Sequence, residues 1–159
     1  MHLAILLDSG IPSLRVLFQQ SIDLWRLNDE STKTSFKPMP HRQILVLGAG
    51  RSSGYLIRYL AHHSTSLECS LTVADQDPNH AQAKIEGLPN CRAVALDPVS
   101  QPEILDTLVK ESRVVISLLP VSLHMQVAMS CLKNKVSLFT ASYQSGEMEA
   151  LAPDINANG

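Results

Sequence analysis

The sequence predicts an α/β fold, in which helices cover both faces of a doubly wound parallel sheet. From residue 43 onward, short apolar runs alternate with amphipathic helical patterns, as in strands joined by right-handed crossovers. The first run, residues 44–47, is wholly apolar, which is typical of a strand buried on both faces. A turn of small residues, Gly48-Ala49-Gly50, follows this run directly and leads into the first helical pattern. These features indicate a strand–turn–helix unit at the start of the sheet.

The other elements follow in order along the chain. We expect strands at residues 44–47, 71–74, 93–96, 114–119 and 136–140. We expect helices between them at residues 55–62, 79–86, 102–110 and 121–133. The apolar spacing predicts the sheet-facing residues of the last two helices: Ile104, Leu105, Leu108 and Val109 in one, and Val121, Met125, Ala128 and Leu132 in the other.

The composition fits one globular domain. The chain has 159 residues, of which 45% are hydrophobic and 18% charged, so it is long enough for a sizeable core. The formal net charge of -2 gives no reason to expect a nucleic-acid partner or an anionic membrane surface. No apolar run approaches the roughly 20 residues of a membrane-spanning helix, so we expect no membrane partner.

The three cysteines, Cys69, Cys91 and Cys131, are far apart and form no CxxC pair. This pattern predicts neither a metal site nor a disulfide framework, and it favours a reducing compartment, the cytoplasm. Residues 3–7 are apolar, but the run is short, no basic segment precedes it and Asp8 closes it. We therefore expect no signal peptide.

Residues 1–42 fit the α/β pattern poorly, and we treat them as an N-terminal extension and linker before a domain of residues 43–159. Residues 13–25 predict an amphipathic helix that carries the only tryptophan, Trp25. Residues 28–40 are polar and predict a linker. The extension is a small helical addition, a tail that packs on a partner, or upstream sequence from a misplaced start.

The turn of small residues predicts dinucleotide binding. Gly48 permits a tight turn, and Gly50 lets a pyrophosphate approach the backbone. The N-terminus of the following helix offers unpaired N–H groups and a partial positive charge to phosphate. Ser52 or Ser53 can cap these groups or bind a phosphate. In the usual fingerprint a third small residue packs helix against strand; here that position is Ser53, so the motif is a variant.

Asp75 ends the second predicted strand, where a carboxylate accepts hydrogen bonds from the adenosine ribose. It follows the glycines by slightly more than the usual ~20 residues, which a polar loop explains. A carboxylate repels a 2′-phosphate, and Gln76, Asp77 and Pro78 supply no cation. The sequence therefore favours NAD, with NADP the weaker candidate. Asp77 is expected to cap the next helix, whereas Asp97 either lies near the adenine or shapes a turn.

Four stretches carry a more specific signal: LGAGRSSGYLIRYL, LTVADQD, RVVISLLPVSLHMQVAMSCLKNKV and TASYQSGEM. Together they resemble the dinucleotide-binding, Rossmann-like half of the saccharopine dehydrogenases, over about residues 43–159. The most specific parts are SLLP, with a histidine four residues beyond the proline, and TASY after the next strand. A generic dinucleotide-binding domain requires neither of them.

The resemblance implies roles for individual residues. The cofactor would be bound by residues of three turns: Gly48, Gly50, Arg51, Ser52, Ser53, Asp75, Gln76, Leu118, Leu119 and Pro120. Ser142 and Tyr143 would contact saccharopine near the nicotinamide. The catalytic acid or base stays unassigned, because His124 lies within a predicted helix, where a packed histidine is more common than a catalytic one.

The resemblance also implies a reaction, the oxidation of an amino-acid-derived secondary amine at its CH–NH bond by NAD(P), in lysine metabolism. Hydride leaves the carbon attached to nitrogen, and water hydrolyses the resulting imine. The small-molecule substrate of the complete enzyme would be saccharopine or another amino-acid-like secondary amine.

Family members continue into a substrate domain and then return to finish the first domain, whereas this chain ends at Gly159. We therefore expect a Rossmann-like fold truncated before the substrate domain, from a fragment of a longer enzyme or a truncated reading frame. Alone it should bind NAD weakly and turn over nothing. The alternative is a stand-alone dinucleotide-binding or sensing module without catalysis. A homo-oligomer stays open in either case.

Overall fold

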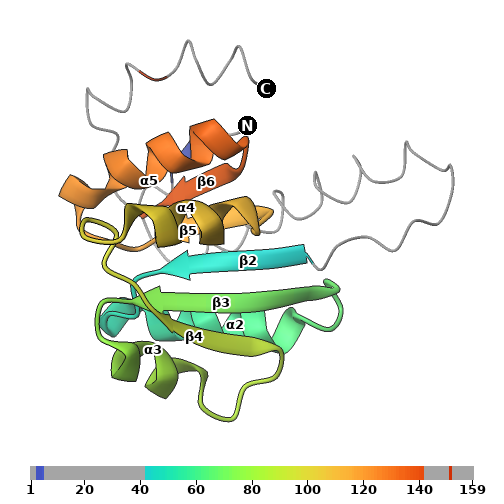
Figure 1. Cartoon of the computed structure of the whole chain (residues 1–159). Helices are drawn as coiled ribbons and strands as arrows, with labels where there is room; N and C mark the ends of the chain where they lie inside the picture. The colour runs from blue at the N-terminus through green and yellow to red at the C-terminus, as the bar shows by residue number, and fades with distance from the viewer. Residues whose placement is uncertain (1–2, 6–41, 142–150, 152–159) are drawn as a thin grey trace, which may run out of the picture.

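The computed structural model describes residues 3–5, 42–141 and 151 of the chain. Its centre is a parallel sheet with the strand order β1-β6-β5-β2-β3-β4 (Figure 1). The strands of this sheet are β1 (Leu3–Ile5), β2 (Arg42–Leu47), β3 (Cys69–Asp75), β4 (Cys91–Ala95), β5 (Val114–Ser117) and β6 (Ser137–Thr140).

The strand order makes the sheet doubly wound. The chain begins its main sheet in the middle, at β2, and moves outward through β3 to β4. It then returns to the other side of β2, where Ile44 pairs with Val114 of β5, and ends at β6. The five strands from β2 to β6 therefore have the 3-2-1-4-5 order of a Rossmann-like fold, which confirms the predicted class.

β1 adds a short strand at the β6 edge, with Leu3 opposite Leu138. The sequence alone predicts no strand in this segment, because its apolar run is short and far from the other strands in sequence. The expected helix at residues 13–25 and the linker at residues 28–40 lie outside the described residues. The boundary near residue 42 between extension and domain stays a prediction.

The helices form a layer on each face of the sheet (Figure 1). α2 (Gly54–His63) and α3 (Pro78–Ile85) pack on the face to which Val46 points. α4 (Pro102–Lys110) and α5 (Val121–Asn134) pack on the opposite face, with Leu45 and Leu47. Since successive residues of a strand point to opposite faces, the apolar run of β2 supplies both cores.

The buried side of α4 agrees with the prediction at three of its four positions. Leu105, Leu108 and Val109 are buried, whereas the side chain of Ile104 is 41% exposed. Ile104 therefore extends the apolar stripe beyond the part that the sheet covers.

The buried side of α5 differs more from the prediction. It consists of His124, Val127, Ala128 and Cys131, whereas Val121 is 58% exposed. The prediction was based on apolar residues and left His124 off the sheet-facing stripe, although Ala128 is buried and Met125 packs against the core as expected. The histidine belongs to the core face, which bears on the site described below.

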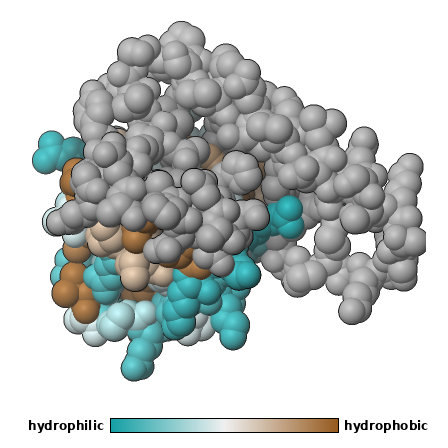
Figure 2. Space-filling model, turned by 90° about the horizontal axis from the view of Figure 1, so that it is seen from above, coloured by the Kyte–Doolittle hydropathy of each residue, from teal (hydrophilic) through white to brown (hydrophobic). Residues whose placement is uncertain are grey.

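The surface of the described chain shows hydrophobic and hydrophilic residues side by side in the view from above (Figure 2). Large apolar side chains that are exposed include Tyr55, Val99 and Met129. Among the described residues, no helix is both long and apolar enough to cross a membrane.

The orientation of α4 predicts different costs for truncating two adjacent aliphatic residues. Leu105→Ala should lower the free energy of unfolding by about 2–5 kcal/mol, because it leaves a cavity in the core. Ile104→Ala, the matched control, should cost less than about 1 kcal/mol, because its side chain already contacts water. Urea denaturation of both variants measures the difference, and equal costs would contradict this orientation.

Candidate functional site

The candidate site lies at the carboxyl edge of the sheet, where the turns after β2, β3 and β5 meet. β2 and β5 are neighbours, yet their connections leave on opposite sides of β2. The crevice at such a switch point is where open α/β sheets bind their ligands. The three turns contain all the cofactor-binding residues predicted from the sequence.

Gly48 makes the sharp turn at the end of β2. Its φ of 97° lies in the left-handed region that favours glycine, and its N–H donates to the Ala74 carbonyl at 2.8 Å. A Cβ at this position would lie 3.1 Å from the carbonyl oxygen of Leu118. Both the backbone conformation and the neighbouring turn therefore exclude a side chain here.

Gly50 has a different role, because its φ of −62° is open to any residue. A Cβ built at Gly50 would have no atom within 4 Å. This glycine thus keeps an open approach to the backbone, as the fingerprint requires for a pyrophosphate.

The backbone beside Gly50 fits a phosphate group. In the described part of the chain, the N–H groups of Gly50, Arg51 and Ser52 have no hydrogen-bond acceptor. These residues lead through the short 3-10 turn η1 (Arg51–Ser53) into α2, so they lie at its N-terminal end. Unpaired N–H groups and the helix dipole together favour an anion at this place.

Ser53 closes the turn from inside. It is 1% exposed, and its Oγ donates to the Gly50 carbonyl at 2.8 Å. Its hydroxyl is therefore committed to the backbone, which makes Ser53 a packing residue at the third small position. Arg51 and Ser52 are exposed and remain available to a ligand. Gly54 packs near Lys84, whose Nζ would lie 3.5 Å from an added Cβ.

Asp75 joins the end of β3 to the glycine turn. Its Oδ2 accepts the Ala49 N–H at 2.6 Å, and its Oδ1 accepts the Asp77 N–H at 3.0 Å. The sequence predicted a ribose-binding carboxylate at this position. It did not predict the hydrogen bond to Ala49, because no local pattern reveals a contact between separate turns. Each carboxylate oxygen keeps a second lone pair, so a ribose hydroxyl can still donate to it.

Two other residues, His80 and Asp77, lie beside the Asp75 carboxylate. His80 in α3 places its Nδ1 3.6 Å from Asp75 Oδ1, and sequence reasoning did not single it out. Asp77 accepts the Asn79 N–H at 2.9 Å, which confirms its predicted role as the cap of α3. Gln76 is exposed beside them.

Asp97, after β4, shapes its own turn. Its carboxylate accepts the Val99 N–H at 3.0 Å and the Ser100 hydroxyl at 2.9 Å. These hydrogen bonds hold the pKa of Asp97 below its ordinary value. Of the two roles left open for this residue, turn formation is the one that the structure displays.

The turn after β5 lies directly against the glycine turn. Leu118 donates its N–H to the Leu47 carbonyl at 2.8 Å. Leu118 and Leu119 are half-buried, and Pro120 is exposed at the start of α5. β5 ends two residues earlier than predicted, because these leucines leave the sheet to form the turn.

A buried polar pair lies beneath this turn. Ser117 Oγ and His124 Nδ1 are 2.9 Å apart, and the residues are 0% and 3% exposed. Burial lowers the pKa of His124 below its ordinary value of 6.5, which favours a neutral imidazole. The sequence indicated a packed histidine but did not identify Ser117 as its partner. The one available signal was that a serine begins SLLP and a histidine follows the proline by four residues.

The structure does not place the substrate side of the site. Ser142 and Tyr143 lie outside the described residues. β6 ends at Thr140, next to β5 on the same edge of the sheet. No catalytic residue is assigned, and among the described residues no cluster of three metal-ligating side chains occurs.

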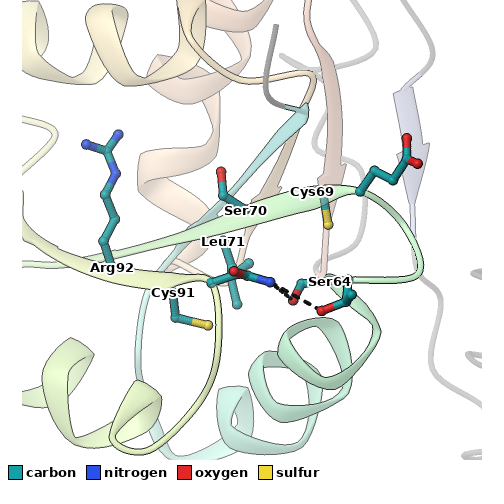
Figure 3. A pocket seen from close by; sticks show the side chains of 9 residues that line it. Ser64, Cys69, Ser70, Leu71, Cys91 and Arg92 are labelled. Atoms are coloured by element: carbon teal, nitrogen blue, oxygen red, sulfur yellow. Dashed lines mark hydrogen bonds between the residues drawn. The ribbon is translucent and has the colours of Figure 1, made fainter. Parts of the chain in front are cut away.

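A groove of about 590 Å³ opens at the other edge of the sheet, beside the first residues of β3 and β4 (Figure 3). Its polar groups bond to one another: Asn90 Nδ2 donates to Ser64 at 3.0 Å and to Thr65 at 3.4 Å. Burial, with a smaller contribution from Cys69, raises the pKa of Cys91, so its thiol is not activated. This groove lies far from the switch point and supplies no residue to the site.

Comparison with known proteins gives a family match. Residues 44–159 match the family model described as the saccharopine dehydrogenase NADP binding domain. The chain is 29% identical over 153 residues to mouse mitochondrial alpha-aminoadipic semialdehyde synthase, covering 96% of this chain and 16% of the relative. It is 34% identical over 108 residues to the NADP(+), L-glutamate-forming saccharopine dehydrogenase of Schizosaccharomyces pombe, covering 68% of this chain and 23% of the relative.

Solved structures agree with this match. An apo, L-Glu-forming saccharopine dehydrogenase from Saccharomyces cerevisiae superimposes with a TM-score of 0.67 and 31% identity, over 74% of this chain and 25% of that one. UDP-N-acetylglucosamine 3-dehydrogenase from Acidithiobacillus ferrooxidans has a TM-score of 0.52 and 22% identity, over 76% of this chain and 36% of that one, which reflects the fold alone. The chain spans about a sixth to a quarter of the length of these three saccharopine-type relatives.

The two glycines predict separable effects. Gly48→Ala should lower the free energy of unfolding by about 1–3 kcal/mol, because its φ and the Leu118 carbonyl oppose a side chain. Gly50→Ala should leave stability within about 0.5 kcal/mol, because its conformation is ordinary and its surroundings are open. It should nevertheless weaken dinucleotide binding by about tenfold, since the methyl group blocks the phosphate approach. Denaturation measures the effect on stability, and calorimetric titration measures the effect on dinucleotide binding. Undiminished binding by Gly50→Ala would contradict a phosphate site at the glycine turn.

The buried His124 predicts a pH dependence of stability. The pKa of His124 is lower in the folded chain than in the unfolded chain, so below pH 6.5 the unfolded chain binds more protons. The stability that depends on neutral His124 is therefore fully present above pH 6.5 and is lost as the pH falls toward the lowered pKa. The slope should reach at most about 1.4 kcal/mol per pH unit. Asp97 and Asp106, with pKa values lowered from 3.8, act only in a more acidic window. In urea denaturation, His124→Asn should flatten this slope; parallel slopes would contradict the assignment.

Proposed function

Because the chain belongs to the saccharopine dehydrogenase family, as its NAD(P)-binding domain, we propose that it is the dinucleotide-binding portion of an oxidoreductase that acts on the CH–NH bond of an amino-acid-derived secondary amine. The observation that carries the proposal is the glycine turn. Its N–H groups at residues 50–52 lack acceptors in the described chain and lie at the switch point of the sheet. An anion such as a pyrophosphate supplies what these groups need.

The chain's own residues would bind and orient the coenzyme. Gly50, Arg51 and Ser52 would hold the pyrophosphate, and Asp75 would accept a ribose hydroxyl. Leu118 and Leu119 would offer an apolar surface along the rest of the molecule. A bound nicotinamide dinucleotide supplies the hydride acceptor for oxidation of the amine.

The substrate is proposed from the relatives, whose names identify them as saccharopine dehydrogenases. An enzyme of this type would remove hydride from the carbon attached to nitrogen, and water would then hydrolyse the imine. Ser142 and Tyr143 follow β6 in the sequence, and their hydroxyls would suit a carboxylate or amine. Saccharopine, in lysine metabolism, is the first candidate, with other amino-acid-like secondary amines next.

For the coenzyme, we propose NAD ahead of NADP. The negative charge of Asp75 lies where a 2′-phosphate would come, and exposed Gln76 follows it in place of a cation. Against this stand the family description and the yeast relatives, which are named for NADP. His80, whose Nδ1 lies 3.6 Å from Asp75 Oδ1, is a candidate for contact with a 2′-phosphate.

A dinucleotide-binding or sensing module without catalysis is the second candidate. It rests on the glycine turn alone, whose N–H groups at residues 50–52 would hold a pyrophosphate without any catalytic residue. The coding sequence after Gly159 distinguishes the candidates. An in-frame substrate domain, or one reached by a single frameshift, supports the enzyme; a stop codon with no such sequence beyond supports the module.

The compartment is also a proposal. Free thiols at Cys69, Cys91 and Cys131 suit a reducing compartment, and we propose the cytoplasm. The mouse, rat and bovine relatives are named as mitochondrial proteins, which makes that organelle the alternative.

Asp75 provides the test of coenzyme choice. The wild-type chain should bind NAD more tightly than NADP in calorimetric titration. Asp75→Asn keeps an acceptor for Ala49 but removes the charge, so it should shift the ratio of the two dissociation constants toward NADP by about tenfold. Asp97→Asn, the matched control after β4, should leave the ratio unchanged. A wild-type preference for NADP would overturn the NAD assignment.

The proposal also predicts what this chain does alone. Given saccharopine and NAD or NADP, the 159-residue chain should form no reduced dinucleotide, because its match to the family is to the NADP-binding domain alone. Absorbance at the nicotinamide band measures this, with the Saccharomyces cerevisiae saccharopine dehydrogenase and NADP as the positive control. Steady production of the reduced form would show that this chain alone suffices.

A further inference from the structure

The pair of Ser117 and His124 is more than a packing contact, because of what lies between them. Ser117 is the last residue of β5, and His124 lies in the first turn of α5. The contact of 2.9 Å between Ser117 Oγ and His124 Nδ1 therefore closes the loop formed by residues 118–120. These are the residues of the SLLP turn that lies against the glycine turn.

Besides the contact between Ser117 and His124, backbone hydrogen bonds hold both ends of the loop. Leu118 donates its N–H to the Leu47 carbonyl at 2.8 Å, and Leu123 donates to the Pro120 carbonyl at 2.9 Å. The Leu118 carbonyl fills the space that a side chain on Gly48 would need. A shift of this loop would therefore move atoms in direct contact with the glycine turn.

The chemistry of the pair explains why a histidine is placed here. Ser117 is fully buried, so its hydroxyl requires a partner inside the protein. A neutral imidazole can donate or accept at Nδ1, and so can match the hydroxyl in either orientation. An aliphatic residue of similar size would fill the volume and leave the hydroxyl unpaired, which favours rearrangement of the loop.

We propose that His124 is a positioning residue, which acts through Ser117 to hold the Leu118–Leu119 backbone against the glycine turn in the geometry that a dinucleotide requires. This inference rests on the proposed dinucleotide binding. It assigns His124 no contact with the coenzyme and no proton transfer.

The test uses the full 159-residue chain labelled with ¹⁵N, in which NMR titration with NADH gives affinity and amide exchange reports on Leu118. His124→Leu should weaken NADH binding by about tenfold and accelerate exchange of the Leu118 amide. His124→Asn, whose side-chain amide can reach the Ser117 hydroxyl, should restore both values to within about threefold of wild type. Ser117→Ala should reproduce His124→Leu in a milder form.

The control is Val127→Ala, one turn further along the buried side of α5. It should lower stability without changing the Leu118 exchange relative to other core amides, and without weakening NADH binding. If it affects both as His124→Leu does, the role of His124 is general packing and the proposal fails.

Other outcomes are equally decisive. Unchanged NADH affinity and unchanged Leu118 exchange in His124→Leu overturn the inference. If His124→Leu does not fold, the comparison of Ser117→Ala with His124→Asn decides in its place. If the wild-type chain binds no dinucleotide, the proposed function fails and this inference falls with it, whereas wild-type binding that is insensitive to both substitutions removes the positioning role alone.

Discussion

The hydrogen bond from the Ala49 N–H to Asp75 Oδ2, at 2.6 Å, is the contact on which the candidate site depends. It joins the turn after β2 to the end of β3. The glycine turn is also held by the Gly48 N–H on the Ala74 carbonyl. A turn of small residues has few side-chain contacts of its own, so it needs these hydrogen bonds from the neighbouring strand to keep its shape.

The same constraint explains the packing at the switch point. Gly48 has no side chain, and the Leu118 carbonyl occupies that space. The turn after β5 can then approach the turn after β2 closely, with its position fixed from below by Ser117 and His124. Two apolar cores on opposite faces of the sheet hold the strands in register, and the polar contacts at the carboxyl edge fix the turns. The two cores thus stabilise the fold, and the polar contacts at the carboxyl edge determine the shape of the turns.

Asp75 illustrates how one side chain can serve both structure and recognition. Its carboxylate accepts two backbone N–H groups and still has lone pairs that a ribose hydroxyl can reach. In the proposed function its charge would bear on coenzyme choice, while its hydrogen bonds bear on the shape of the glycine turn. A change at this position would then alter affinity and selectivity together, unless the substitution keeps an acceptor.

The sequence by itself determined the fold class, the order of strands and helices from β2 to β6 and the identity of the glycine turn. These follow from local patterns: apolar runs, helical spacing, and glycines where a side chain is excluded. It also determined the cap at Asp77, since that bond joins neighbouring residues. Only the tertiary structure decided which face of α5 is buried, what Asp75 clamps and what His124 contacts. Those contacts join residues on different elements, and their energies depend on distances that no single stretch of sequence encodes.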